Sequence, residues 1–146
     1  MIGLLQRVTR ASVAVDGRVV AGIGPGLLVL VGVRPEDGAV QAGRLLERLL
    51  DYRVFPDAAG RMNRSLRETG GGLLLVPQFT LAADTRKGTR AGFSTAAPPE
   101  QARALFGQLV AQAEVAWPRT GAGVFGADMQ VELVNDGPVT FWLEAR

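Results

Sequence analysis

The chain has 146 residues and a mass of 15.4 kDa, which suits one domain, residues 1–146, with its own hydrophobic core. It contains no cysteine and no histidine, which excludes disulfides, thiol nucleophiles, imidazole bases and zinc sites of the usual ligand set. The net charge is only +2 and no apolar run approaches the ~18 residues of a membrane span, so we expect a cytoplasmic protein without a membrane segment.

Residues 1–33 alternate apolar and polar positions and predict three strands. Asp16-Gly17 supplies a tight hairpin turn between the first two. The Gly24-Pro25-Gly26 stretch then breaks the chain before the apolar run 27–33, which predicts a buried strand.

Residues 36–52 change to a helical period, because their leucines fall on one side of a helix. We expect a short strand over 53–55 and a second buried strand over 73–81. The small, polar and basic residues of 82–97 predict a long surface loop. A second helix is expected to begin near Pro98-Pro99 and to end at about residue 114.

The last part of the chain predicts two strands, 128–134 and 139–143, joined by Asn135-Asp136-Gly137-Pro138. Many strands with only two helices, without regular alternation, favour an α+β fold. We expect a small barrel-like antiparallel or mixed β-sheet with two main helices packed outside it.

Polar Gln78 and Thr80 interrupt the strongly apolar stretch that begins at Leu73. If that stretch is buried, both side chains need partners, because an unpaired buried polar group costs roughly 1–3 kcal/mol. Hydrogen bonds to neighbouring loops are the ordinary explanation, and a reaction site is the alternative.

Three cations follow in the next loop: Arg86, Lys87 and Arg90. Their position beside a candidate pocket favours an anionic substrate, whereas taken alone such a loop is usually only solvated. For the 125–129 stretch, Phe-Gly-Ala-Asp-Met, core packing is the default interpretation. For 135–140 a hairpin connection is the default, but a bond before proline is one of the few that adopts the cis form at a small free-energy difference.

Taken together, these stretches resemble the D-aminoacyl-tRNA deacylases over essentially the whole chain and in the same order. The segments that carry the resemblance are Gln6-Arg7-Val8, residues 24–33, Gly60-Arg61-Met62-Asn63, Gln78-Phe79-Thr80-Leu81, residues 83–88, residues 125–129 and residues 135–140. The resemblance implies a homodimeric hydrolase that uses no metal or cofactor. Its substrate would be the aminoacylated 3′ end of tRNA, from which it removes D-amino acids and mischarged glycine.

The resemblance also implies roles for individual residues. In the family a cis Gly-Pro pair, here Gly137 and Pro138, reaches across the dimer into the partner's pocket, where its carbonyls hold the amino group of the substrate. Arg7 is expected to brace that turn.

A Ser-Gln-x-Thr strand lines the ester in the family, which gives this role to Gln78, Phe79 and Thr80, with main-chain N–H groups near the reacting carbonyl. Phe125 and Met129 match positions of the pocket wall, and Arg86, Lys87 and Arg90 would meet tRNA phosphates. One departure stands at Pro77, where the family has serine, because proline supplies neither a hydroxyl nor an N–H.

Without histidine or cysteine, the favoured mechanism is noncovalent: the protein orients water and stabilises the oxyanion with main-chain donors. Thr80 as a covalent nucleophile lacks an evident base. Two alternatives remain at this stage: an inactive RNA-binding relative disabled by Pro77, and an esterase that acts on small D-amino acid derivatives.

Overall fold

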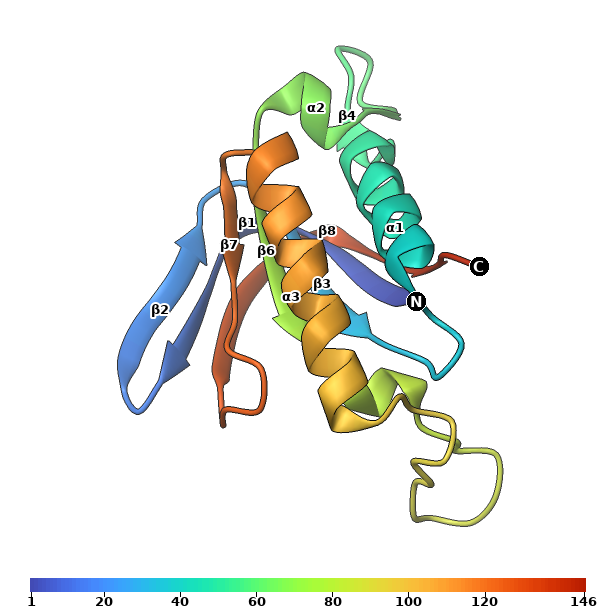
Figure 1. Ribbon diagram of the computed structural model, residues 1–146. Coiled ribbons are helices and arrows are strands. Elements are labelled where there is room, and N and C mark those ends of the chain that lie inside the picture. The colour runs from blue at the N-terminus through green and yellow to red at the C-terminus, as the bar shows by residue number, and fades with distance from the viewer.

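The computed structural model describes residues 1–146 as a strongly curved mixed β-sheet with two long helices against one face (Figure 1). The strands of the main sheet, in spatial order, are β2 (Arg18–Ile23), β1 (Ile2–Val15), β3 (Gly26–Gly32), β6 (Gly72–Pro77) and β7 (Thr120–Ala122), and β8 (Gln130–Glu144) also pairs with β1. The pairs β3–β6 and β6–β7 are parallel, and the others are antiparallel. The expected barrel-like α+β fold is confirmed.

The long strand β1 causes the curvature of the sheet. On one edge it pairs with β8 along most of its length; on the other it pairs first with β3, through residues 2–8, and then with β2, through residues 11–15. The sheet therefore splits and rolls over, so that Ala21 of β2 packs against Gly121 of β7 and the barrel is nearly closed.

Two hydrophobic cores follow from the alternation of side chains along these strands. The larger core lies between the sheet and the helices α1 (Ala39–Asp51) and α3 (Pro99–Ala116), where the leucine stripe of α1 meets Leu27 and Leu73. The smaller core fills the barrel on the opposite face. Its fully buried members are Val8, Ala11, Val13, Leu28, Leu74 and Val76.

Helix α1 begins three residues later than the periodicity predicts, because the preceding polar groups form a turn of their own. The Asp37 carboxylate accepts a hydrogen bond from the Arg34 N–H at 2.7 Å, and Gln41 Oε1 accepts one from the Gly38 N–H at 2.9 Å. This second contact satisfies an N–H group at the helix start that would otherwise lack an acceptor.

Three short elements were not predicted: β5 (Met62–Arg64), which pairs with β4 (Phe55–Pro56), the one-turn helix α2 (Leu66–Thr69), and β7.

The expected strand over 73–81 is wrong in its second half. Strand β6 ends at Pro77, and residues Phe79–Ala82 form a 3₁₀ helix, η1. Pairing with β7 ends opposite Leu75, and the last pair with β3 joins Pro77 to Val31, so no strand partner continues beyond Pro77.

The expected turn at 135–138 between two strands is wrong as well. Strand β8 is continuous, and both of its halves pair antiparallel with β1: Thr140 with Gln6 and Asn135 with Val8. Residues 136–139 are extra residues opposite Arg7 and bulge out of the strand.

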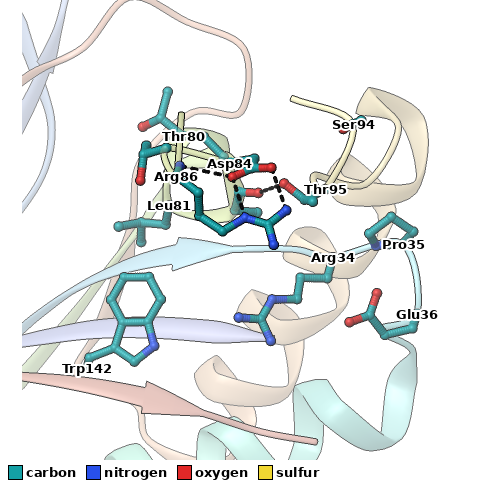
Figure 2. A pocket seen from close by; sticks show the side chains of 13 residues that line it. Arg34, Pro35, Glu36, Thr80, Leu81, Asp84, Arg86, Ser94, Thr95 and Trp142 are labelled. Carbon is teal, nitrogen blue, oxygen red and sulfur yellow. Dashed lines mark hydrogen bonds and ion pairs between the residues drawn. The ribbon is translucent and has the colours of Figure 1, made fainter. Parts of the chain in front are cut away.

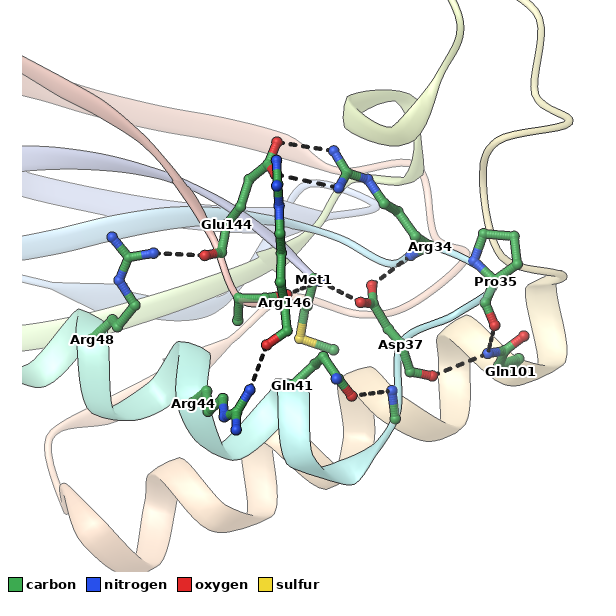
Figure 3. A network of polar contacts seen from close by, with 12 residues as sticks. Met1, Arg34, Pro35, Asp37, Gln41, Arg44, Arg48, Gln101, Glu144 and Arg146 are labelled. Carbon is green, nitrogen blue, oxygen red and sulfur yellow. Dashed lines mark hydrogen bonds and ion pairs between the residues drawn. The ribbon is translucent and has the colours of Figure 1, made fainter.

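A polar network fixes the two ends of the chain against α1 (Figure 3). The Met1 ammonium group is fully buried, is paired with the Asp37 carboxylate, and donates to the Ala145 carbonyl at 2.8 Å. Arg34 donates to Glu144 Oε1 at 3.0 Å and holds the pKa of Glu144 at about 2, with further hydrogen bonds from Trp142 and Arg146.

Replacement of Glu144 by glutamine is expected to lower stability at neutral pH. Folding lowers the pKa of Glu144 from 4.5 to about 2, so the stabilisation is complete above about pH 4.5 and is lost as the pH falls towards 2. Because glutamine does not titrate, the melting temperatures of wild type and Glu144→Gln should converge between about pH 5 and pH 2. Thermal melts across this range check the expectation, and a constant difference would contradict it.

None of the helices combines the length and the apolar character that crossing a bilayer requires.

Candidate active site

A cavity of about 450 Å³ opens where β6 ends, between η1, the start of α3 and the segment before β8. Five of the residues proposed from the sequence line it together: Pro77, Gln78, Phe79, Phe125 and Met129. Segments almost 50 residues apart in the chain therefore meet in one apolar cavity. Sequence reasoning missed its other walls, which are Val76, Ala97, Pro99, Ala102, Gly126, Ala127 and Val131.

The main chain at the start of η1 presents hydrogen-bond donors at this place. The first bond of the 3₁₀ helix runs from the Leu81 N–H to the Gln78 carbonyl at 3.3 Å. The N–H groups of Phe79 and Thr80 precede it and therefore have no acceptor within the helix. Both donors belong to the backbone and do not depend on which side chain precedes them.

Pro77 is accommodated without loss of a sheet hydrogen bond. The next residue, Gln78, donates its N–H to the Val31 carbonyl at 2.7 Å, on the β3 side. By the alternation of a strand, the N–H that proline lacks would point to the other side, beyond the end of β7.

Gln78 and Thr80 do not need partners elsewhere in the fold, because the condition of full burial is not met. Gln78 is half-buried and Thr80 is exposed, and Gln78 Nε2 donates to Thr80 Oγ1 at 2.5 Å. No acidic or basic side chain lines the 450 Å³ cavity. Thr80 lines a neighbouring cavity together with Glu36 and Asp84, but its hydroxyl is hydrogen-bonded to Gln78 and to neither carboxylate. The chain contains no cluster of three or more acidic, histidine or cysteine side chains placed to hold a metal ion.

Aromatic contacts fix the two ring-bearing walls of the cavity. Phe79 is about half exposed and packs on Phe93 with ring centroids 5.1 Å apart. Phe125 packs on Phe106 with ring centroids 6.4 Å apart, and the Arg103 guanidinium lies over the Phe125 ring, 4.9 Å from its centroid. Phe93 and Arg103 support the cavity, although nothing in the sequence pattern singles them out.

A second and larger cavity, of about 820 Å³, lies on the other side of η1 and includes Thr80, Arg34 and Trp142 in its walls (Figure 2). Arg86 also faces this cavity, but its charge is already paired. Its Nε and Nη2 atoms donate to the two carboxylate oxygens of Asp84 at 2.9 and 2.7 Å. These hydrogen bonds hold the pKa of Asp84 at about 2.

The other two predicted cations, Lys87 and Arg90, share a third cavity of about 480 Å³ with the Asp84–Arg86 pair. Neither forms an ion pair within the chain. The three cations proposed from the sequence therefore lie together, and Lys87 and Arg90 are the two whose charge is not paired with a carboxylate.

Gly137 and Pro138 lie in the bulge of β8 and do not line the 450 Å³ cavity of their own chain. The peptide bond between them is cis, and both residues are exposed. Arg7, whose side chain is only 12% exposed, donates from Nε to the Asp136 carbonyl at 2.9 Å and from Nη1 to the Val54 carbonyl at 2.6 Å. Arg7 therefore contacts the base of the bulge, next to the Gly-Pro pair.

A model of the protein family described as D-Tyr-tRNA(Tyr) deacylase matches residues 4–144. The chain belongs to the D-aminoacyl-tRNA deacylase family. A D-aminoacyl-tRNA deacylase of Alkalilimnicola ehrlichii is 66% identical over all of this chain and 97% of its own length, and that of Azotobacter vinelandii is 62% identical over 99% of this chain and its whole length.

Solved structures share the fold of this D-aminoacyl-tRNA deacylase family member. The chain named c-Myc DNA Unwinding Element Binding Protein has a TM-score of 0.95 and 38% identity, covering all of this chain and 99% of its own. A probable eukaryotic D-amino acid tRNA deacylase has a TM-score of 0.84 at 18% identity, covers 98% of both chains and supports the fold alone.

Proposed function

We propose that this protein hydrolyses the ester bond of D-aminoacyl-tRNA, and of mischarged glycyl-tRNA, and rejects L-aminoacyl-tRNA. It works as one domain and in the cytoplasm, where aminoacyl-tRNA is used. The observation that carries the proposal is the 450 Å³ cavity, which holds Gln78 and Phe79 beside main-chain N–H groups without an acceptor in η1. An activated ester needs little more than a positioned water and such donors.

In the proposed reaction, the ester carbonyl lies against the N–H groups of Phe79 and Thr80. Water attacks the carbonyl carbon, the negative charge of the tetrahedral intermediate forms on the carbonyl oxygen, and these N–H groups stabilise it. The C–O bond to the ribose then breaks and releases the free amino acid and the tRNA. The proton that water loses passes to the departing ribose oxygen. The free 2′-hydroxyl of the terminal adenosine assists this transfer, because no acidic or basic side chain lines the 450 Å³ cavity.

We further propose a homodimer in which the Gly137-Pro138 turn enters the partner's cavity and holds the amino group of the substrate. Two observations support this arrangement. The turn is exposed and lies outside the cavity of its own chain. In addition, Leu4, Leu30 and Trp142 stand side by side across β3, β1 and β8 and are partly or largely exposed, which makes an apolar surface suited to a second copy.

The direct test is deacylation of D-tyrosyl-tRNA, L-tyrosyl-tRNA and glycyl-tRNA by the purified protein in the presence of a chelator. We expect turnover of the D and glycyl esters only. Equal turnover of a short D-aminoacyl-adenosine would indicate an esterase of small substrates instead. Sedimentation at micromolar concentration tests the dimer, and a monomer that is fully active would contradict the shared site.

The alternative without catalysis is a nucleic-acid-binding protein, which is favoured only by the name of the 38% identical DNA Unwinding Element Binding Protein. It predicts tRNA binding with no hydrolysis of any aminoacyl ester. A gain of hydrolysis on Pro77→Ser, from an inactive wild type, would mark this chain as a disabled relative.

Thr80→Ala is expected to keep measurable activity, reduced by on the order of tenfold. The change removes the hydroxyl that accepts from Gln78 Nε2, but it leaves the main-chain N–H groups of Phe79 and Thr80 in place. Single-turnover deacylation with D-tyrosyl-tRNA measures the effect. A folded variant with no turnover, or an acyl ester trapped on Thr80 in the wild type, would contradict the noncovalent route.

Charge reversal of the two unpaired cations, Lys87→Glu with Arg90→Glu, is expected to weaken tRNA binding. The salt slope of log Kd should fall by about one for each cation, because phosphate contacts act by releasing counterions. Binding measured between low and high salt checks this. The single variants Lys87→Glu and Arg90→Glu are each compared with Arg18→Glu on the distant strand β2, which makes the same change in net charge (Figure 1). An unchanged affinity and slope would remove Lys87 and Arg90 from the tRNA interface.

A further inference from the structure

The bulge that carries Gly137 and Pro138 is held by two separate sets of contacts. Gln6 pairs with Thr140 and Val8 with Asn135, so residues 136–139 all lie opposite the single residue Arg7. A bulge of this size has lost its ladder hydrogen bonds and keeps a defined shape only if other groups replace them. Arg7 supplies one replacement, at the Asp136 carbonyl.

Asn135 supplies the other replacement hydrogen bonds, at the C-terminal end of the bulge. Its Oδ1 accepts a hydrogen bond from the Val139 N–H at 2.8 Å, and its Nδ2 donates to Thr140 Oγ1 at 2.8 Å. The half-buried Asn135 side chain therefore joins the residue before the bulge to Val139 and Thr140 at the end of it.

Neither the contact from Arg7 nor the contacts from Asn135 alone fix the Gly137-Pro138 turn that lies between them. The contact from Arg7 ends at residue 136, before Gly137, whereas the contacts from Asn135 end at residues 139 and 140, after Pro138. Without the second set, the chain after Pro138 could rotate and carry the carbonyls of the turn with it. A displacement of about 1 Å in carbonyls that position a substrate's amino group is enough to lower the reaction rate.

We propose that Asn135 is a positioning residue that sets the direction of the Gly137 and Pro138 carbonyls and thereby the selectivity for D over L substrates. This inference rests on the proposed function, because those carbonyls are taken to hold the substrate's amino group. Asn135 touches no substrate atom itself; it acts through Val139 and Thr140.

The side-chain chemistry at this position allows a rescue experiment. Alanine removes both contacts. Aspartate keeps an oxygen for the Val139 N–H, and its second oxygen can accept from the Thr140 hydroxyl, which reverses the direction of that hydrogen bond but preserves it. Thr140→Val removes one contact of the two. Asn63→Ala is a matched control, because Asn63, in strand β5, likewise makes two side-chain hydrogen bonds, with Asp57 and Arg53.

The experiment measures kcat/KM of each variant with D-tyrosyl-tRNA and L-tyrosyl-tRNA. We expect Asn135→Ala to lower the D-to-L ratio by on the order of tenfold or more, Thr140→Val to have a smaller effect, and Asn135→Asp to stay within about threefold of wild type. Asn63→Ala should keep the wild-type ratio. Hydrogen exchange at the Val139 amide should accelerate in Asn135→Ala and stay slow in Asn135→Asp.

The outcomes separate this inference from the function on which it rests. A wild type that hydrolyses no D-aminoacyl-tRNA overturns the proposed function and the inference with it. An active wild type, together with an Asn135→Ala variant of unchanged D-to-L ratio, overturns the inference alone. If Asn135→Ala does not fold, Thr140→Val decides: an unchanged ratio there overturns the positioning role, and so does an Asn135→Asp variant that folds but is not rescued.

Discussion

Gly137→Ala is expected to reduce kcat/KM for D-aminoacyl-tRNA by on the order of 100-fold while the protein remains folded. Gly137 has φ of +142°, a conformation that side-chain-bearing residues rarely adopt, and a Cβ there would lie 2.7 Å from Cγ2 of Val139. The Val139 side chain and the exposed turn must therefore shift, which moves the Gly137 and Pro138 carbonyls from the positions that Arg7 and Asn135 hold. A methyl group would also occupy the space that a substrate amino group needs.

The measurement is steady-state deacylation together with a thermal melt. Gly17→Ala in the β1–β2 turn is the control, because Gly17 also has a positive φ, +75°, but a Cβ there would meet no atom within 4 Å. It should lower stability slightly without changing kcat/KM. Equal activity of wild type and Gly137→Ala would exclude the turn from the site.

Gly26→Ala is expected to have the largest effect on folding, a loss of about 4 kcal/mol or more. Gly26 pairs with Gly72 where the parallel strands β3 and β6 begin. A Cβ on Gly26 would overlap the Gly72 carbonyl oxygen and would lie 2.6 Å from the Gly72 nitrogen. Backbone cannot move aside as the end of a side chain can, so the central pair of the sheet must separate.

Chemical denaturation and thermal melting measure this effect, and the melting temperature should fall by about 10 °C or more. Gly24→Ala is the matched control from the same turn, because a Cβ there would have no neighbour within 4 Å. A Gly26→Ala protein as stable as Gly24→Ala would mean that the strands are less closely packed than described.

The sequence predicted those elements whose pattern of apolar residues matches the side chains that the fold buries. The apolar run 27–33 became the buried strand β3, and the leucine stripe of 36–52 became α1, because side-chain burial alone determines both. The prediction of a hairpin turn at 135–138 was wrong because the sequence Asn-Asp-Gly-Pro is typical of a turn between strands. Only the pairing of both halves of β8 with one neighbour distinguishes a bulge from a hairpin, and that is a long-range property.

For the candidate site, family resemblance identified Pro77, Gln78, Phe79, Phe125 and Met129, which the structure brings into one cavity. The 3₁₀ turn at Phe79 was not predictable, because it begins where pairing of β6 with both β3 and β7 has ended, and that depends on distant parts of the chain. The Asp84–Arg86 pair also escaped prediction, since the sequence shows three cations but not which of them is already neutralised. The alanines and valine of the cavity wall look like any core residues.

The cavity beside η1 is lined by one glutamine and otherwise by apolar or small residues, with no acid and no base. A hydrolytic site of this kind has no protonation state of its own, so it presents the same electrostatic surface at every pH at which the fold persists. The donors of the proposed reaction belong to the peptide backbone, so a change of a lining side chain removes one of them only where the new residue is proline. On the proposed mechanism, such a site can exchange wall residues, as proline for serine at position 77, and change its fit to the substrate while its main-chain donors stay the same.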